Sequence, residues 1–157
     1  MILIVGGLII LTLLGMNFSE SYKWKSQIQY YNEALIASSG LGQSIIEQIM
    51  KRSFDEKTRT KAVTSTDSLT AVASLGTDSG ESNVLLFDDV DDFNNYTRND
   101  TLSIYGIYNI SVKVYYNVKM NPNTKSNTRT FSKRVDVKVY NPYLGIDSVK
   151  LNHIITY

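Results

Sequence analysis

The sequence predicts an α+β fold in which a long N-terminal helix packs on a C-terminal antiparallel sheet of about four strands. Three patterns support this prediction. Residues 1–18 form an apolar run, residues 24–49 repeat apolar and small side chains at helical spacing, and residues 110–140 alternate apolar and polar side chains. The apolar first half of the helix is expected to project, while the amphipathic second half covers the sheet.

The same patterns divide the 157 residues into a helix and a head. We expect the helix over residues 1–52 and the head over residues 53–157. Within the head, an irregular connection over residues 53–100 precedes the sheet over residues 101–157. A chain of this length fits one domain with a projecting helix.

The composition argues against several classes of function. The formal charge is only +1 and the basic residues are scattered, which argues against a nucleic-acid partner. Cysteine is absent, so disulfides are excluded, and the single histidine, His153, excludes a histidine cluster for a metal. The sequence has no Gly-rich phosphate loop, Ser-centred elbow or cofactor fingerprint. We therefore expect no enzyme activity, no catalytic residues and no cofactor.

Residues 1–18 are the most distinctive segment of the chain. From Met1 to Met16 they carry no charge, and Thr12 is the only polar side chain. As a helix they would extend about 25 Å, slightly less than the roughly 30 Å apolar thickness of a bilayer. A cleaved signal peptide is one interpretation, but the basic start and the small-residue cleavage site are missing.

Two other interpretations of this segment are a permanent membrane anchor and a helix that leaves the membrane to pack against copies of itself. Three glycines favour the second, because glycine weakens a helix by about 1 kcal/mol against alanine but lets a neighbouring backbone approach closely. The residues expected to form such an assembly core are Met1, Ile2, Leu3, Val5, Gly6, Gly7, Ile10, Leu14 and Gly15.

The helical pattern continues beyond the apolar run. Apolar and small side chains recur at alternating spacings of four and three, which draws one stripe along a helix. A break at Gly40 and Gly42 is the alternative. The residues expected to pack on the sheet are Trp24, Ile28, Tyr31, Leu35, Ile45 and Ile49.

The connection contains an acidic segment over residues 84–96. Its four aspartates could bind a hard cation such as Ca²⁺, although their spacing does not match an EF-hand. The alternative is a solvated acidic turn whose apolar residues, Phe87, Val90, Phe93 and Tyr96, point inward. The candidate cation ligands are Asp88, Asp89, Asp91 and Asp92.

Two alternating stretches predict a long hairpin, with a turn at residues 121–127. The first inward face comprises Ile110, Val112, Val114, Tyr116, Val118 and Met120. The second comprises Phe131, Val135, Val137 and Val139.

Two further strands complete the predicted sheet. Residues 101–108 are expected to form a strand interrupted at Gly106, and residues 149–157 a terminal strand. His153 lies on one face of the terminal strand, together with Val149, Leu151 and Ile155. It is therefore expected to be a packed or sheet-surface residue and not a catalytic one.

This layout resembles the type IV pilins and pseudopilins, in which an apolar N-terminal helix continues as an amphipathic helix against an antiparallel sheet. The run FDDVDDFNNY at residues 87–96 also resembles segments of some pilin-like proteins. Two features depart from the family. Val5 stands where most bacterial pilins carry a glutamate, and no basic leader precedes the apolar run. The resemblance therefore implies a processed form whose amine at Met1 is free or N-methylated.

The resemblance implies that the chain is a subunit of an extracellular filament, held in the inner membrane before a pilus assembly machinery extracts it. Identical subunits are the expected partners. The alternatives are an exported adhesin or binding module on a single membrane anchor, and a minor pseudopilin of a secretion system. Three sequons in the head are candidate glycosylation sites, at Asn95, Asn99 and Asn109.

Overall fold

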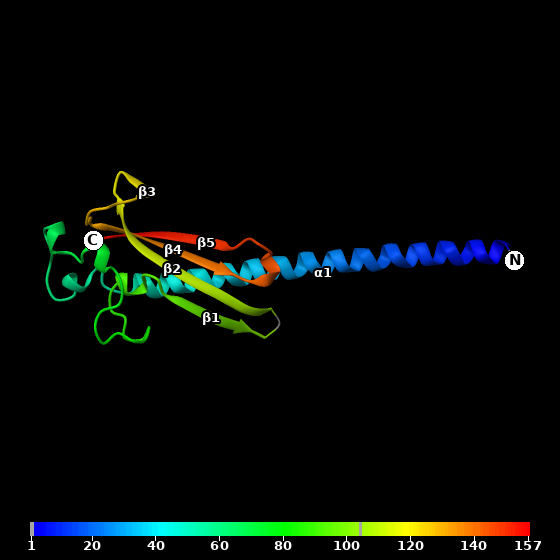
Figure 1. Ribbon diagram of the computed structural model, residues 1–157, viewed down its shortest axis with the longest axis horizontal. Coiled ribbons are helices and arrows are strands. Elements are labelled where there is room, and N and C mark those ends of the chain that lie inside the picture. The colour runs from blue at the N-terminus through cyan, green and yellow to red at the C-terminus, as the bar shows by residue number, and fades with distance from the viewer. Residues whose placement is uncertain (1, 104) are drawn as a thin grey trace.

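The computed structural model describes residues 2–103 and 105–157 and shows an α+β fold (Figure 1). One helix, α1 (Ile2–Met50), lies against an antiparallel sheet and projects far beyond it. The strands are β1 (Thr97–Leu102), β2 (Gly106–Val118), β3 (Asn121–Lys125), β4 (Ser132–Tyr140) and β5 (Val149–Thr156). Their order across the sheet is β1-β2-β4-β5, and the short β3 pairs with the end of β2.

Helix α1 is continuous over 49 residues, or about 73 Å at the standard rise. The alternative of a break at Gly40 and Gly42 is therefore wrong. The buried face of the helix begins at Ala34 and continues through Ser38, Ile45 and Ile49. This face packs mainly on β4 and β5, and it closes one side of the sheet as the sequence predicts.

The expectation that Trp24, Ile28, Tyr31 and Leu35 pack on the sheet is wrong, because their side chains are 67, 56, 40 and 39% exposed. The sheet ends too early to reach them. A Cβ on Gly42 would already meet Val139 and Leu151, which lie within two residues of the ends of β4 and β5. Only Ile45 and Ile49 of the six expected packing residues are buried.

Gly42 marks the closest approach of the helix to the sheet. A Cβ at this position would lie 2.7 Å from Leu151 Cδ1, whereas one at Gly40 would have nothing within 4 Å among the described atoms. Replacing Gly42 by leucine is therefore expected to destabilise the head by about 1–3 kcal/mol through overpacking.

The matched change Gly40→Leu is expected to stabilise the protein by up to about 1 kcal/mol, since it improves helix propensity without a collision. Urea unfolding of the full chain in detergent, followed by circular dichroism, measures both variants. Equal effects of the two changes would contradict this account of the helix–sheet contact.

The predicted hairpin is present as the pair β2 and β4. Val112, Val114 and Tyr116 lie opposite Val137, Val135 and Lys133, and all six residues are buried. The terminal strand β5 pairs along β4, with His153 opposite Val135. His153 is half-buried on this strand, in agreement with the expectation of a sheet residue.

The ends of the hairpin differ from the prediction. A β-bulge between Asn117 and Val118 interrupts the alternation, so Val118 and Met120 are exposed instead of buried. The expected turn at residues 121–127 contains β3. The expected strand at residues 101–108 is not one strand, because this range contains the end of β1, a short turn and the start of β2, where Gly106 adopts a φ of 75°.

The connection between α1 and β1 covers residues 51–96 and contains four short 3-10 turns. It is tied to the sheet by a second apolar cluster, in which Phe54, Val63 and Leu69 surround Tyr116. Val72 and Leu75 pack partly against this cluster. A parallel bridge between Ser53 and Asp89 brings the acidic segment beside the end of the helix.

Candidate assembly surface

The projecting half of α1 carries a continuous apolar surface. Its most apolar stretch is entirely unburied within the described chain, and it is long and apolar enough to cross a membrane. Among the described side chains up to Phe18, nine large ones are each more than half exposed: Ile4, Val5, Leu8, Ile10, Leu11, Leu13, Leu14, Met16 and Phe18. Water is a poor solvent for such a surface, which therefore needs lipid or protein around it.

The expected assembly-core residues lie along this surface. Val5, Ile10 and Leu14 are exposed, and added Cβ atoms at Gly6, Gly7 and Gly15 would meet none of the described atoms within 4 Å. Met1 lies outside the described residues, and Ile2 and Leu3 are placed only as helix backbone. The hydroxyl of Thr12, the one polar side chain from Met1 to Met16, donates to Leu8 O at 3.1 Å.

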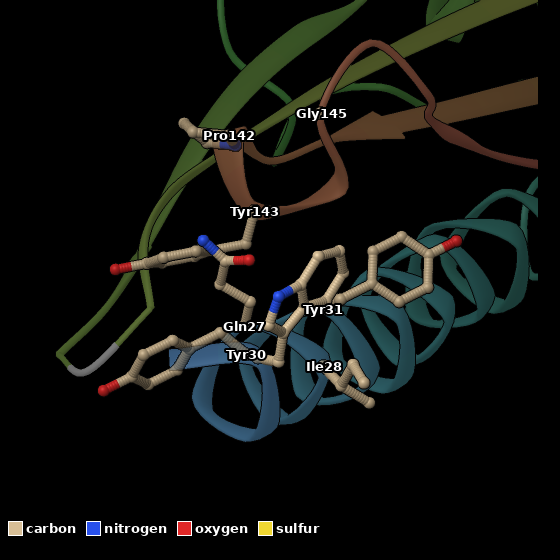
Figure 2. A pocket seen from close by; sticks show the side chains of 8 residues that line it. Gln27, Ile28, Tyr30, Tyr31, Pro142, Tyr143 and Gly145 are labelled. Atoms are coloured by element: carbon tan, nitrogen blue, oxygen red, sulfur yellow. The ribbon is translucent and has the colours of Figure 1, made fainter. Parts of the chain in front are cut away.

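A groove lies where the projecting half of α1 meets the head, and it extends the apolar surface to the head (Figure 2). It has a volume of about 520 Å³ and lies between α1 and the turn Pro142–Leu144. Tyr30 stacks on Tyr143 with 5.2 Å between ring centroids, and Gln27 faces the same turn (Figure 2). Trp24, Ile28 and Tyr31 line this open groove and do not pack on the sheet.

The acidic segment is not the solvated turn that the sequence suggests. Asp89, Asp91 and Asp92 are 2, 2 and 3% exposed, although Phe87, Val90 and Phe93 are buried as expected. Asp89 Oδ1 accepts the backbone N–H groups of Asp91 and Asp92 at 2.8 and 3.2 Å. The buried carboxyl groups thus stabilise the turn by accepting hydrogen bonds from its backbone.

The four aspartates do not form one cation site. Asp91 contacts the buried ammonium of Lys133, and Asp89 is occupied by the backbone bonds of the turn. The structure instead brings Glu81, Asp88 and Asp92 together, with one oxygen of each within 4.8 Å of the others. Asp88 also forms an ion pair with Arg59 at 2.6 Å. Sequence reasoning missed Glu81 because a loop closure places it there.

Burial raises the pKa of Asp89 to about 9, and the nearby Asp91 adds to the effect. The folded protein therefore holds a proton that the unfolded chain releases near pH 4. Its contribution to stability is present at low pH and is lost as the pH rises toward about 9.

Replacing Asp89 by asparagine should flatten this pH dependence, because the amide cannot ionise and its oxygen still accepts both backbone bonds. Between pH 5 and pH 9 we expect the free energy of unfolding of the variant to rise relative to that of wild type by at least about 1.4 kcal/mol, the equivalent of one pKa unit. Urea unfolding across this pH range measures the effect, with the exposed Asp147→Asn as the control. A variant profile parallel to that of wild type would contradict the assignment.

The three sequon asparagines are all exposed on the head. Asn109 on β2 donates its side-chain amide to Asn99 on β1 at 2.8 Å. Asn95, at a φ of 65°, accepts a hydrogen bond from Lys113. Their exposure is compatible with glycosylation, which stays a prediction that the intact mass of the purified protein tests.

Comparison with known proteins gave no family model, no curated protein and no solved structure that matches this chain.

Proposed function

We propose that this protein is the structural subunit of an extracellular, type IV pilus-like filament. Its apolar helix half holds the subunit in the inner membrane, and a pilus assembly machinery then transfers it into a helical polymer of identical subunits. The observation that carries the proposal is the exposed apolar half of α1, beyond the reach of the head. Filament formation gives this surface a partner outside the membrane.

The gain from assembly is large enough to hold a polymer without covalent links. Burying half of a helix surface of roughly 1,500 Å² at about 25 cal/mol per Å² would supply on the order of 20 kcal/mol. Ordering the subunits costs several kcal/mol of this gross term. Gly6, Gly7 and Gly15 would let neighbouring helices approach closely. Because position 5 is Val5 and not an acid, the register between subunits would come from packing.

The competing function is an exported binding module or adhesin on a single membrane anchor. It is favoured by the length and apolarity of α1, which suffice for a membrane span. A minor pseudopilin of a secretion system would share the same architecture but occur in few copies. Glycines are not needed in a plain anchor, and this favours the filament.

Shearing cells that express the full chain separates these functions. A filament subunit is expected in the sheared fraction as polymers that sediment and that electron microscopy resolves. An anchored module would stay with the membranes and become monomeric in detergent, which would overturn the proposal. A few copies at the base of another assembly would also overturn it and favour the pseudopilin function.

A further inference from the structure

The head contains a buried cluster that joins three distant parts of the chain. Lys133 on β4 is completely buried, and its side chain lies beside Asp55 and Asp91, whose side chains are 0 and 3% exposed. Lys133 Nζ is 3.0 Å from Asp55 Oδ2 and 2.7 Å from Phe54 O, and it contacts Asp91 Oδ1 directly. A primary amine and two carboxyl groups are thus held together out of water.

Aromatic rings seal the cluster. Lys133 Nζ lies 4.7 Å from the centre of the Phe54 ring and 5.3 Å from that of Tyr116. The Tyr116 hydroxyl lies 3.2 Å from Asp55 Oδ2. Amide formation between an amine and a carboxyl group is hindered in water, because both groups are ionised there and are not held together. A dry site that holds them in contact supplies an effective concentration of about 10⁵ M or more.

We propose that Lys133 and Asp91 form an intramolecular isopeptide bond between Nζ and the side-chain carbonyl carbon of Asp91. This bond would tie the acidic segment covalently to β4. The inference goes beyond the proposed function and does not depend on it, because it concerns a bond inside one head.

The two carboxyl groups have different roles in this reaction. Burial raises the pKa of Asp91 despite the neighbouring ammonium, and this favours the protonated form in which a carboxyl carbon is electrophilic. Burial would also raise the pKa of Asp55, but the charge of Lys133 and the hydrogen bonds of Thr70 and Lys57 hold it below the usual value. Asp55 is therefore the carboxylate that accepts a proton.

The reaction is a condensation that balances within the cluster. The Lys133 ammonium gives one proton to the Asp55 carboxylate, and the free amine attacks the carboxyl carbon of Asp91. The nitrogen–carbon bond forms, and the carbon–hydroxyl bond of Asp91 breaks. The hydroxyl leaves as water with a second proton from the nitrogen. The products are the amide, one water molecule and a protonated Asp55, and no oxidant or cofactor is needed.

Asp89 is the positioning residue of the reaction. Its Oδ1 accepts the backbone N–H groups of Asp91 and Asp92 at 2.8 and 3.2 Å, and its buried carboxyl group lies close enough to that of Asp91 to affect its pKa. The two hydrogen bonds fix the backbone that directs the Asp91 side chain to Lys133.

Peptide mass spectrometry of the denatured, purified full chain tests the bond. Cleavage at Lys and Arg places Asp91 in the peptide of residues 62–98 and Asp55 in that of residues 53–57. We expect a branched peptide joining residues 62–98 to the segment around Lys133, lighter than the sum of its parts by about 18 Da, one water. Fragmentation should place the branch at Asp91.

Three variants sharpen the test. Lys133→Arg retains the charge and Asp91→Ala removes the acyl donor, so the branched peptide is expected to be lost in both. Lys113→Arg changes an exposed lysine on β2 and should retain it. A wild-type protein in which Lys133 is unmodified, or is linked to Asp55, overturns the proposal without reference to how any variant folds.

Discussion

Replacing Asp55 by alanine is expected to destabilise the head by about 3–5 kcal/mol, because no carboxylate would then take the proton of Lys133, and its ammonium would stay buried without an ionised partner. Asp55 also accepts hydrogen bonds from the backbone of Lys57 at 3.2 Å and of Thr70 at 3.0 Å, and from the Tyr116 hydroxyl. All these donors would be left unsatisfied or exposed to water that enters the cavity. The loss should therefore exceed that of an ordinary surface mutation several-fold.

Urea unfolding of the full chain in detergent measures this difference in free energy. Asp67→Ala is the matched control, because Asp67 is exposed and lies in the same connection. The control is expected to change stability by less than about 0.5 kcal/mol. Similar effects of the two changes would show that the cluster around Lys133 does not hold the connection to the sheet.

Replacing Ile10 by aspartate is expected to abolish assembly while leaving the head folded. The Ile10 side chain is 60% exposed in the isolated chain, and the proposed filament would bury it among neighbouring helices. A charge there costs several kcal/mol per subunit when it has no partner, and the cost repeats at every subunit of the polymer. Gly6→Leu is expected to act in the same direction by keeping helices apart.

Sedimentation of sheared material and circular dichroism of the purified subunit measure these two properties separately. Lys119→Asp, a charge change on the exposed end of the sheet, is the control and should leave assembly intact. Normal filaments from the Ile10→Asp subunit would place the apolar segment outside the assembly contacts.

Much of the fold follows from periodicity, since the helix, the β2–β4 hairpin and the terminal strand are all where the patterns place them. The length of helix that packs on the sheet, in contrast, cannot be predicted from periodicity. The stripe from Trp24 to Ile49 indicates which face of the helix is apolar. How far the sheet extends along that face depends on where its strands end. A β-bulge at Asn117 likewise shifts the faces of β2 in a way that strict alternation cannot indicate.

The buried cluster of Lys133, Asp55 and Asp91 also could not be predicted from the polarity pattern alone. Lys133 occupies an inward position between Phe131 and Val135, and a charge at such a position indicates a buried partner. The partners, Asp55 and Asp91, are 78 and 42 residues away in the sequence, and only the folded connection brings them together. The apolar segment, in contrast, is evident from composition because its surface needs no partner within the same chain.

The most direct test of the central claim is electron microscopy of the full chain sheared from cells and kept free of detergent. We expect helical polymers in which the apolar helices occupy the axis and the sheet-bearing heads lie outside. Single molecules whose apolar helices remain in lipid would contradict it.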